Sequence, residues 1–268
     1  MKRLLSLSLL LIFMTACGKK EESLKTSSSA PQKAEAATTM PVAPTNYPSY
    51  SDEPDPSFTI PKPARKQSKY YPEGSALREI QDLDDMLDSY VLDPKTPEDL
   101  KYNDNLKKAV IHGTFDIREL CQMALGKHWA ERTPQEQDQF VNLMIRLLEK
   151  KAIFSKEQGQ KKKSSGSTYK VSYLAEEFIG TDKAKAIAKT TVSIPSQKLN
   201  IDLDYKLKKN GNRWRVYDII VDSASLLENY KFQFDKIINK EGYPSLVQRM
   251  EKKLEEINKK PASTDVTP

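Results

Sequence analysis

The sequence predicts an α+β domain in which a curved antiparallel sheet of about four strands carries helices packed on one face. Apolar residues recur with helical spacing between residues 76 and 154, and then alternate with polar residues, as in strands, between residues 169 and 221. The connections between the alternating segments are short. Short connections favour antiparallel hairpins, because parallel strands need long crossovers.

The first half of the domain is expected to be helical. Residues 76–92 place Ile80, Leu83 and Leu87 on one face. Three further helix starts carry capping residues: Thr96 before Pro97, Asp116 three residues before Glu119, and the T-x-x-E box at 133–136. Gly126 follows the second of these helices, where glycine commonly ends a helix.

The second half is expected to form the sheet. Asn210-Gly211 lies between two alternating segments and predicts the turn of a hairpin. In the segment after that turn, the apolar parity changes between Val216 and Ile219, which predicts a β-bulge near Tyr217-Asp218. Two helices, 225–240 and 244–258, are predicted to close the domain.

The N-terminus has the pattern of an export signal. Lys2 and Arg3 precede an apolar run, residues 4–13, that is too short for a bilayer, which needs about 20 residues, but long enough for a secretory signal. Thr15 and Ala16 then lead into Cys17, an arrangement that resembles a bacterial lipoprotein signal. We therefore expect cleavage of residues 1–16 and acylation of Cys17 with diacylglycerol and palmitate-type chains. The alternative is an ordinary cleaved signal with a chance cysteine.

Composition divides the rest of the chain. Residues 17–75 are rich in Ser, Ala and Pro and lack an apolar period, which predicts a disordered linker that would tether the domain to a membrane. Residues 76–259 are long enough for one folded domain, and 260–268 are predicted to be a disordered tail. The net charge is +6, but an exported protein is not expected to bind nucleic acid.

Side chains typical of catalysis or metal binding are sparse. His112 and His128 are the two histidines, and neither has a metal-ligand spacing to a cysteine. Asp204, Asp218 and Asp222 could form an acid–base pair, although structural hydrogen bonding is the simpler role. We expect no catalytic site, no metal and no cofactor.

Two further observations concern the core. Cys121 belongs to an apolar helical stripe, so it is expected to be buried and, with Cys17 acylated, to form no disulfide. One predicted strand presents Ala184, Ala186 and Ala188 where neighbouring strands present large residues. The space beside these alanines must be filled, either by a helix side chain or by a ligand.

Two stretches resemble the MlaC family of periplasmic phospholipid carriers: "MALGKHW" (123–129) followed by "TPQEQDQF" (133–140), and "DYKLKKNGNRWRVYDIIVDSASLLENYKFQF" (204–234). The resemblance implies a sheet and helices that enclose an apolar cavity for phospholipid tails. It also implies shuttling of lipid between an outer-membrane lipoprotein–porin complex and the lipid-binding subunit of an inner-membrane ABC transporter. Members of this family are usually soluble, so the lipobox-like Cys17 would make this chain a tethered periplasmic variant. Gly18, rather than Asp, follows the cysteine, which points to the outer membrane.

The resemblance also implies which residues line the cavity, on the inward strand face and the facing helices, and it favours lipid as the filler beside the alanines. The expected lining residues are Met144, Leu147, Leu148, Phe154, Val171, Tyr173, Ala188, Val192, Leu203, Tyr205, Val216 and Phe234. Two other functions stay open at this point. One is an enzyme on a cone-shaped α+β fold, with a site built from Asp218, Asp222 or His128, and the other is a structural lipoprotein with a solid core.

Overall fold

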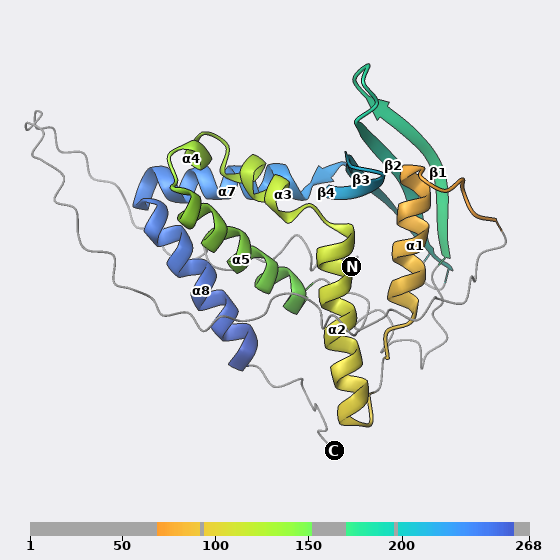
Figure 1. Cartoon of the computed structure of the whole chain (residues 1–268), viewed down its shortest axis with the longest axis horizontal. Helices are drawn as coiled ribbons and strands as arrows, with labels where there is room; N and C mark the ends of the chain where they lie inside the picture. Colours follow the sequence, from red (N-terminus) through yellow and green to blue (C-terminus); the bar gives the residue numbers. More distant parts are fainter. Residues whose placement is uncertain (1–68, 92–93, 152–169, 196–197, 260–268) are drawn as a thin grey trace, which may run out of the picture.

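The computed structural model describes residues 69–91, 94–151, 170–195 and 198–259. Within these ranges, five helices come first, then five strands, then two helices (Figure 1). The helices are α1 (Ala76–Asp88), α2 (Pro97–Thr114), α3 (Ile117–Leu125), α4 (Lys127–Ala130), α5 (Pro134–Lys151), α7 (Leu226–Glu241) and α8 (Tyr243–Lys259). The strands are β1 (Lys170–Ile179), β2 (Lys185–Ile194), β3 (Leu199–Asn210), β4 (Arg213–Val221) and β5 (Ala224–Ser225).

The predicted helix starts are confirmed by their hydrogen bonds. Thr96 and Asp99 form a reciprocal capping box at α2, and the Asp116 carboxylate accepts a hydrogen bond from the Glu119 N–H at α3. The Thr133 Oγ1 accepts a bond from the Glu136 N–H, 3.2 Å away, at α5. Each bond satisfies an N–H that the helix itself leaves without an acceptor. α1 ends at Asp88, four residues before the predicted end.

The sheet is antiparallel and open, with the order β1-β2-β3-β4-β5. The predicted bulge is present: Lys206 pairs with Asp218 and Leu207 with Val216, which leaves Tyr217 as the extra residue. The turn before it is centred on Gly211-Asn212 rather than on Asn210-Gly211, because Asn210 already pairs with Arg213. The two-residue strand β5 was not predicted, since its sequence is too short to show an alternation.

Helices cover the sheet as predicted and also reach its other face. α1 packs on one face of the sheet (Figure 1), and α2 contacts both α1 and β4. Glu119 of α3 pairs with Lys185 and Lys208, which point to the opposite face of the sheet. Of the part of the chain that the structure describes, no helix combines the length and the apolar character needed to cross a membrane.

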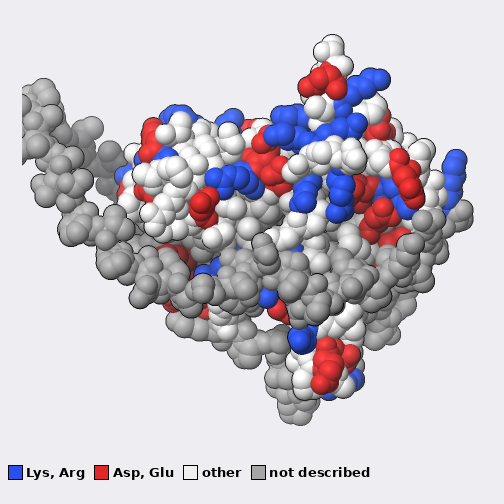
Figure 2. Space-filling view, viewed as in Figure 1, with Lys and Arg blue, Asp and Glu red and all other residues white. Residues whose placement is uncertain are grey.

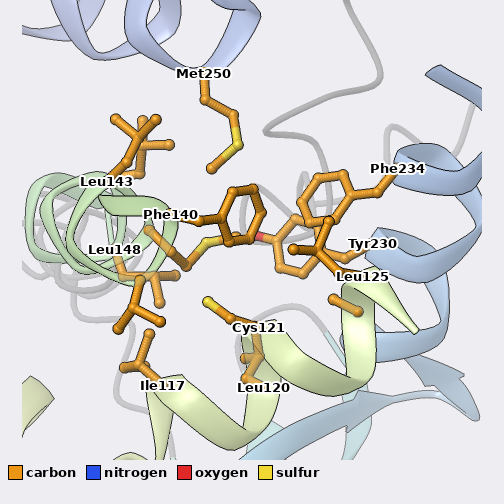
Figure 3. Packing of buried hydrophobic residues seen from close by; sticks show 14 of the residues in the cluster. Ile117, Leu120, Cys121, Leu125, Phe140, Leu143, Leu148, Tyr230, Phe234 and Met250 are labelled. Atoms are coloured by element: carbon orange, nitrogen blue, oxygen red, sulfur yellow. The ribbon is translucent and has the colours of Figure 1, made fainter. Parts of the chain in front are cut away.

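Helices α3, α5, α7 and α8 supply most of a separate core, here called the helical core, to which Ile111 of α2 and Tyr217 of β4 also belong. Figure 3 shows the Phe140 ring at its centre, between Met250 and Cys121 and facing Phe234. Phe140 meets Phe234 edge-on with ring centroids 5.7 Å apart, a favourable aromatic geometry. Cys121 is fully buried in this core, as predicted.

Candidate functional site

The candidate site lies on the face of the sheet that α1 covers, here called the inner face. Because the strands pair in register, side chains from neighbouring strands form rows across this face. In order along the sheet, the rows are Phe178–Ala186–Leu207–Val216, Glu176–Ala188–Tyr205–Ile219, Tyr173–Thr190–Leu203–Val221, Val171–Val192–Ile201 and Ile194–Leu199.

α1 covers the central part of the first two rows, whereas Phe178, at the end of the first row, is 45% exposed. Ala186 and Ala188 are fully buried, and they form one cluster with Ala76, Leu77 and Ile80 of the helix. Because the side chains of Ala186 and Ala188 are small, α1 can pack close to the sheet at this position. The family resemblance implied lipid as the filler beside these alanines, whereas in the structure α1 packs against them.

Polar contacts hold α1 in this position. The Glu176 carboxylate accepts hydrogen bonds from the N–H groups of Ala76 (2.5 Å) and Leu77 (3.1 Å). A carboxylate here is favourable because the N-terminus of a helix carries partial positive charge. Further along α1, the Tyr173 hydroxyl donates a hydrogen bond to Asp84 at 2.5 Å. These contacts connect both ends of the sheet-facing part of α1 to β1.

The apolar side chains in the second half of α1 pack on α2, and the contact of this half with the sheet that is described above is the polar one from Tyr173 to Asp84. Leu83 forms a separate cluster with Leu106 and Val110 of α2. The last two rows of the inner face, here called the distal rows, therefore lie beyond the part of the sheet that α1 packs against. The distal rows are Val171, Val192, Ile201, Ile194 and Leu199.

Each side chain of the distal rows is half-buried. Among the described residues, the distal rows belong to none of the three apolar clusters. They form a continuous apolar surface, because adjacent members stand side by side on neighbouring strands. Such a surface is suited to contact an aliphatic chain and offers no ligand to a metal.

The structure divides the predicted lining residues into two groups. Those on the inner face are Val171, Tyr173, Ala188, Val192, Leu203, Tyr205 and Val216. Those in the helical core are Met144, Leu147, Leu148 and Phe234. Phe234 is fully buried and its ring stacks on Tyr230, with ring centroids 5.4 Å apart. Phe154 lies outside the described residues.

Sequence reasoning left three residues of the distal rows out of the expected lining: Ile194, Leu199 and Ile201. The alternation in residues 184–194 and 199–207 already placed them on the same strand face as Val192 and Leu203. Only the register between the strands shows that they form a continuous surface with Val171.

The acid–base candidates do not converge. The Asp218 carboxylate accepts a hydrogen bond from the Leu227 N–H (2.9 Å) and so supports the start of α7. Asp222 accepts a bond from the β3 backbone, and the His128 Nε2 lies 3.0 Å from Asp235 in another part of the molecule. Each group has a local structural role.

Asp204 is also remote from the distal rows, because it lies on the opposite face of β3. Burial raises the pKa of its carboxyl group, and a hydrogen bond from the Thr190 N–H opposes that rise. Burial likewise raises the pKa of the Cys121 thiol, which makes it a poor nucleophile. Within the described ranges there is no group of three or more His, Cys, Asp or Glu side chains that could hold a metal.

Residues 83–252 match the family described as MlaC protein. The chain belongs to the MlaC family. The match runs from Leu83 in α1 to Lys252 in α8, so it includes the distal rows and both stretches on which the resemblance was based.

One solved structure shares the MlaC-family fold of this chain at 25% sequence identity, with a TM-score of 0.56. It is a phospholipid-binding protein from Ralstonia solanacearum, in complex with a phospholipid. The likeness covers 69% of this chain and 99% of that chain. The predicted α+β fold, a sheet packed with helices, is confirmed. No curated protein matches the chain.

Proposed function

We propose that this chain is a phospholipid-binding carrier of the bacterial periplasm, and that the distal rows contact the acyl chains of its cargo. The observation that carries the proposal is the continuous, half-buried apolar surface at Val171, Val192 and Ile201, beyond the part of the sheet that α1 covers. Membership of the MlaC family and the phospholipid held by the Ralstonia relative support lipid as the occupant.

The physical chemistry of such a site suits carriage without catalysis. Moving an acyl chain from water to an apolar surface is favourable by about 0.8 kcal/mol for each CH₂ group. A bound lipid would therefore be retained while the carrier crosses water. Transfer from a bilayer to the protein exchanges one apolar environment for another, so it needs little net free energy when a docking partner excludes water.

The transport route belongs to the same proposal. In this route, Cys17 is acylated, residues 18–75 act as a tether, and the anchor lies in the outer membrane. The partners are an outer-membrane lipoprotein–porin complex and an inner-membrane ABC transporter. Two or three acyl chains would give stable attachment, and a tether raises the effective concentration at partners within reach to about the millimolar range. Cys17 and residues 18–68 of the tether lie outside the described residues, whereas Tyr71, near the end of the tether, donates its N–H to the Gln81 side chain of α1.

Native mass spectrometry of the purified chain, followed by lipid extraction, tests the cargo. We expect one or more phospholipids to copurify with the protein. Val192→Glu should remove most of this lipid, because a carboxylate among the distal rows cannot contact acyl chains favourably. Ser193→Glu is the matched control, since it makes a comparable change one residue along and on the opposite face of β2.

The same experiment distinguishes the carrier from a structural lipoprotein that binds no lipid. A structural lipoprotein with a solid core is supported by the tight packing of α1 on Ala186 and Ala188. That alternative predicts that no phospholipid copurifies with the wild-type chain, with the Val192→Glu variant or with the Ser193→Glu variant. Such an outcome would exclude the carrier proposal.

A further inference from the structure

A second feature of the sheet lies at the end opposite the distal rows. There the β1–β2 and β3–β4 connections lie next to each other, since the Lys209 N–H donates a hydrogen bond to the Ala184 carbonyl at 2.8 Å. Figure 1 shows the β1–β2 hairpin projecting beyond the helices. We call this end of the sheet the basic tip. It comprises Phe178, Ile179, Lys183, Lys185, Lys208, Lys209, Arg213 and Arg215.

The basic tip exposes large apolar side chains. Phe178 is 45% exposed and Ile179 is 38% exposed, and they are consecutive residues at the end of β1. Because consecutive strand residues point to opposite faces, the pair presents apolar surface on both sides of the projecting hairpin. Apolar groups on a projection could enter the interfacial region of a bilayer with little rearrangement of the fold.

The charges of the basic tip are mainly positive. Lys185 and Lys208 share the single carboxylate of Glu119, and Arg213 pairs with Glu79. The six cationic residues of the basic tip therefore have three carboxylates near them: Glu79, Glu119 and Asp182 of the β1–β2 turn. Figure 2 shows lysine and arginine side chains gathered over this end of the sheet.

Three of the lysines of the basic tip contact aromatic rings, and of these Lys185, over Tyr217, also pairs with Glu119, whereas Lys183 and Lys209 do not. The Lys183 Nζ lies over the Phe178 ring, 5.5 Å from its centroid, and the Lys209 Nζ lies 5.2 Å from the Trp214 centroid. Within the described residues neither lysine forms an ion pair with a carboxylate. Both ammonium groups are therefore available to an external anion.

We infer that the basic tip is a docking site for an anionic lipid bilayer, with the lysines on lipid phosphates and Phe178 and Ile179 in the interfacial region. The combination of features favours a bilayer over an acidic protein. An acidic protein would neutralise the lysines but would not require adjacent apolar residues at the point of a projecting hairpin. Exposed apolar side chains beside lysines match the interface of an anionic membrane. The inference does not rest on the proposed carriage of lipid, because the basic tip and the distal rows lie at opposite ends of the sheet.

A site-specific fluorophore tests the inference in the full chain. A background Cys17→Ser substitution removes the expected acylation site, and buried Cys121 is protected from labelling in the native state. An environment-sensitive label is attached through Thr181→Cys, in the exposed β1–β2 turn, and in a second sample through Gln248→Cys, on the exposed surface of α8. We expect the label at 181 to report a less polar environment on addition of vesicles of phosphatidylglycerol and phosphatidylcholine. The label at 248 should not respond.

Charge-reversal substitutions then test whether the lysines of the basic tip contact the vesicle. Lys183→Glu with Lys209→Glu should weaken vesicle affinity at least tenfold, because each basic residue near an anionic surface contributes about 1 kcal/mol. Lys236→Glu with Lys240→Glu, at exposed positions of α7, is the matched control and should have little effect. High salt should weaken binding by the wild-type basic tip, since the Debye length falls to about 3 Å at 1 M.

Replacement of the exposed apolar residues with serine provides an independent measurement. Phe178→Ser with Ile179→Ser should reduce the label response several-fold, whereas Phe232→Ser, at a position 69% exposed on α7, should not. Circular dichroism confirms that each variant is folded. The inference is overturned if the label at 181 does not respond to anionic vesicles, or if the α7 variants weaken binding as much as those at the basic tip. It is also overturned if the label responds to soluble polyglutamate but not to bilayers.

Discussion

Replacing Ala188 with leucine tests which group fills the space beside the alanines of β2. Ala188 is fully buried, and so are the residues of α1 against which it packs: Ala76, Leu77 and Ile80 are each at most 1% exposed. A leucine would add three carbon atoms to a site whose surroundings are already closely packed. Overpacking of this kind typically destabilises a protein by about 1–3 kcal/mol.

The cost cannot be avoided easily by moving α1. Its first N–H groups are bonded to Glu176, and the Trp214 Nε1 donates a hydrogen bond to the Gly74 carbonyl (2.8 Å) just before the helix. A shift of α1 would lengthen these bonds, each with a net value of about 1 kcal/mol. In a domain of this size, 1 kcal/mol corresponds to about 2–4 °C in Tm, so we expect Tm to fall by about 2–12 °C.

Thermal unfolding followed by circular dichroism measures the effect, with Ala175→Leu as the control. Ala175 lies on β1, half-buried and on the opposite face of the sheet, so the same enlargement there should change Tm by less than 2 °C, or about 0.5 kcal/mol. If Ala188→Leu leaves Tm unchanged but reduces the copurifying lipid, the space beside Ala188 belongs to the cargo. That result would refute the assignment of this space to α1.

The remaining predictions concern other parts of the fold. Glu176→Gln should destabilise the domain by about 0.5–1 kcal/mol in urea unfolding, because the amide keeps a hydrogen-bond acceptor at the start of α1 but loses its charge; an unchanged midpoint would contradict this. Burial raises the pKa of Tyr243 to about 12, above the value of about 10 expected in the unfolded chain, so its contribution to stability is complete below pH 10 and is lost as the pH rises toward 12. Tyr243→Phe should therefore make stability fall less steeply between pH 10 and 12, and equal slopes would argue against the burial effect. Cys121 is fully buried, so a thiol reagent should modify it in denaturant but not in the native protein, as mass spectrometry would show.

Local features of the fold could be predicted because local interactions determine them. The cap at Thr96 depends on residues three or four positions away, and the structure contains it as predicted. The bulge at Tyr217 could be inferred because an extra residue reverses the parity of every later side chain, and the change from Val216 to Ile219 records that reversal.

The position of the candidate site could not be predicted equally well, because it depends on which elements meet. Sequence periodicity shows that Met144 and Phe234 are inward-facing, but it does not show which interior they face. The structure puts both in the helical core, whereas Val192 lies on the sheet. The two short residues Ala186 and Ala188 were equally ambiguous, since small side chains accommodate a helix as readily as a ligand.

The dimensions of α1 explain why part of the inner face is left for another partner. The helix has 13 residues and is about 20 Å long, at 1.5 Å per residue, whereas the ten residues of β2 span about 33 Å. Of the buried residues of α1, those from Ala76 to Ile80 join the cluster on the sheet, whereas Leu83 packs on α2, and Asp84 contacts the sheet through the hydrogen bond from Tyr173. One part of the inner face is therefore covered by α1, and the other part, the distal rows, is not covered by this helix.

If the distal rows hold the cargo, then Val192→Glu should remove lipid with little change in the free energy of unfolding of the lipid-free protein. Ala188→Leu should lower that free energy whether or not lipid is bound. These two variants, measured on lipid-free and lipid-loaded protein, distinguish a lipid site at the distal rows from a lipid site between α1 and Ala188.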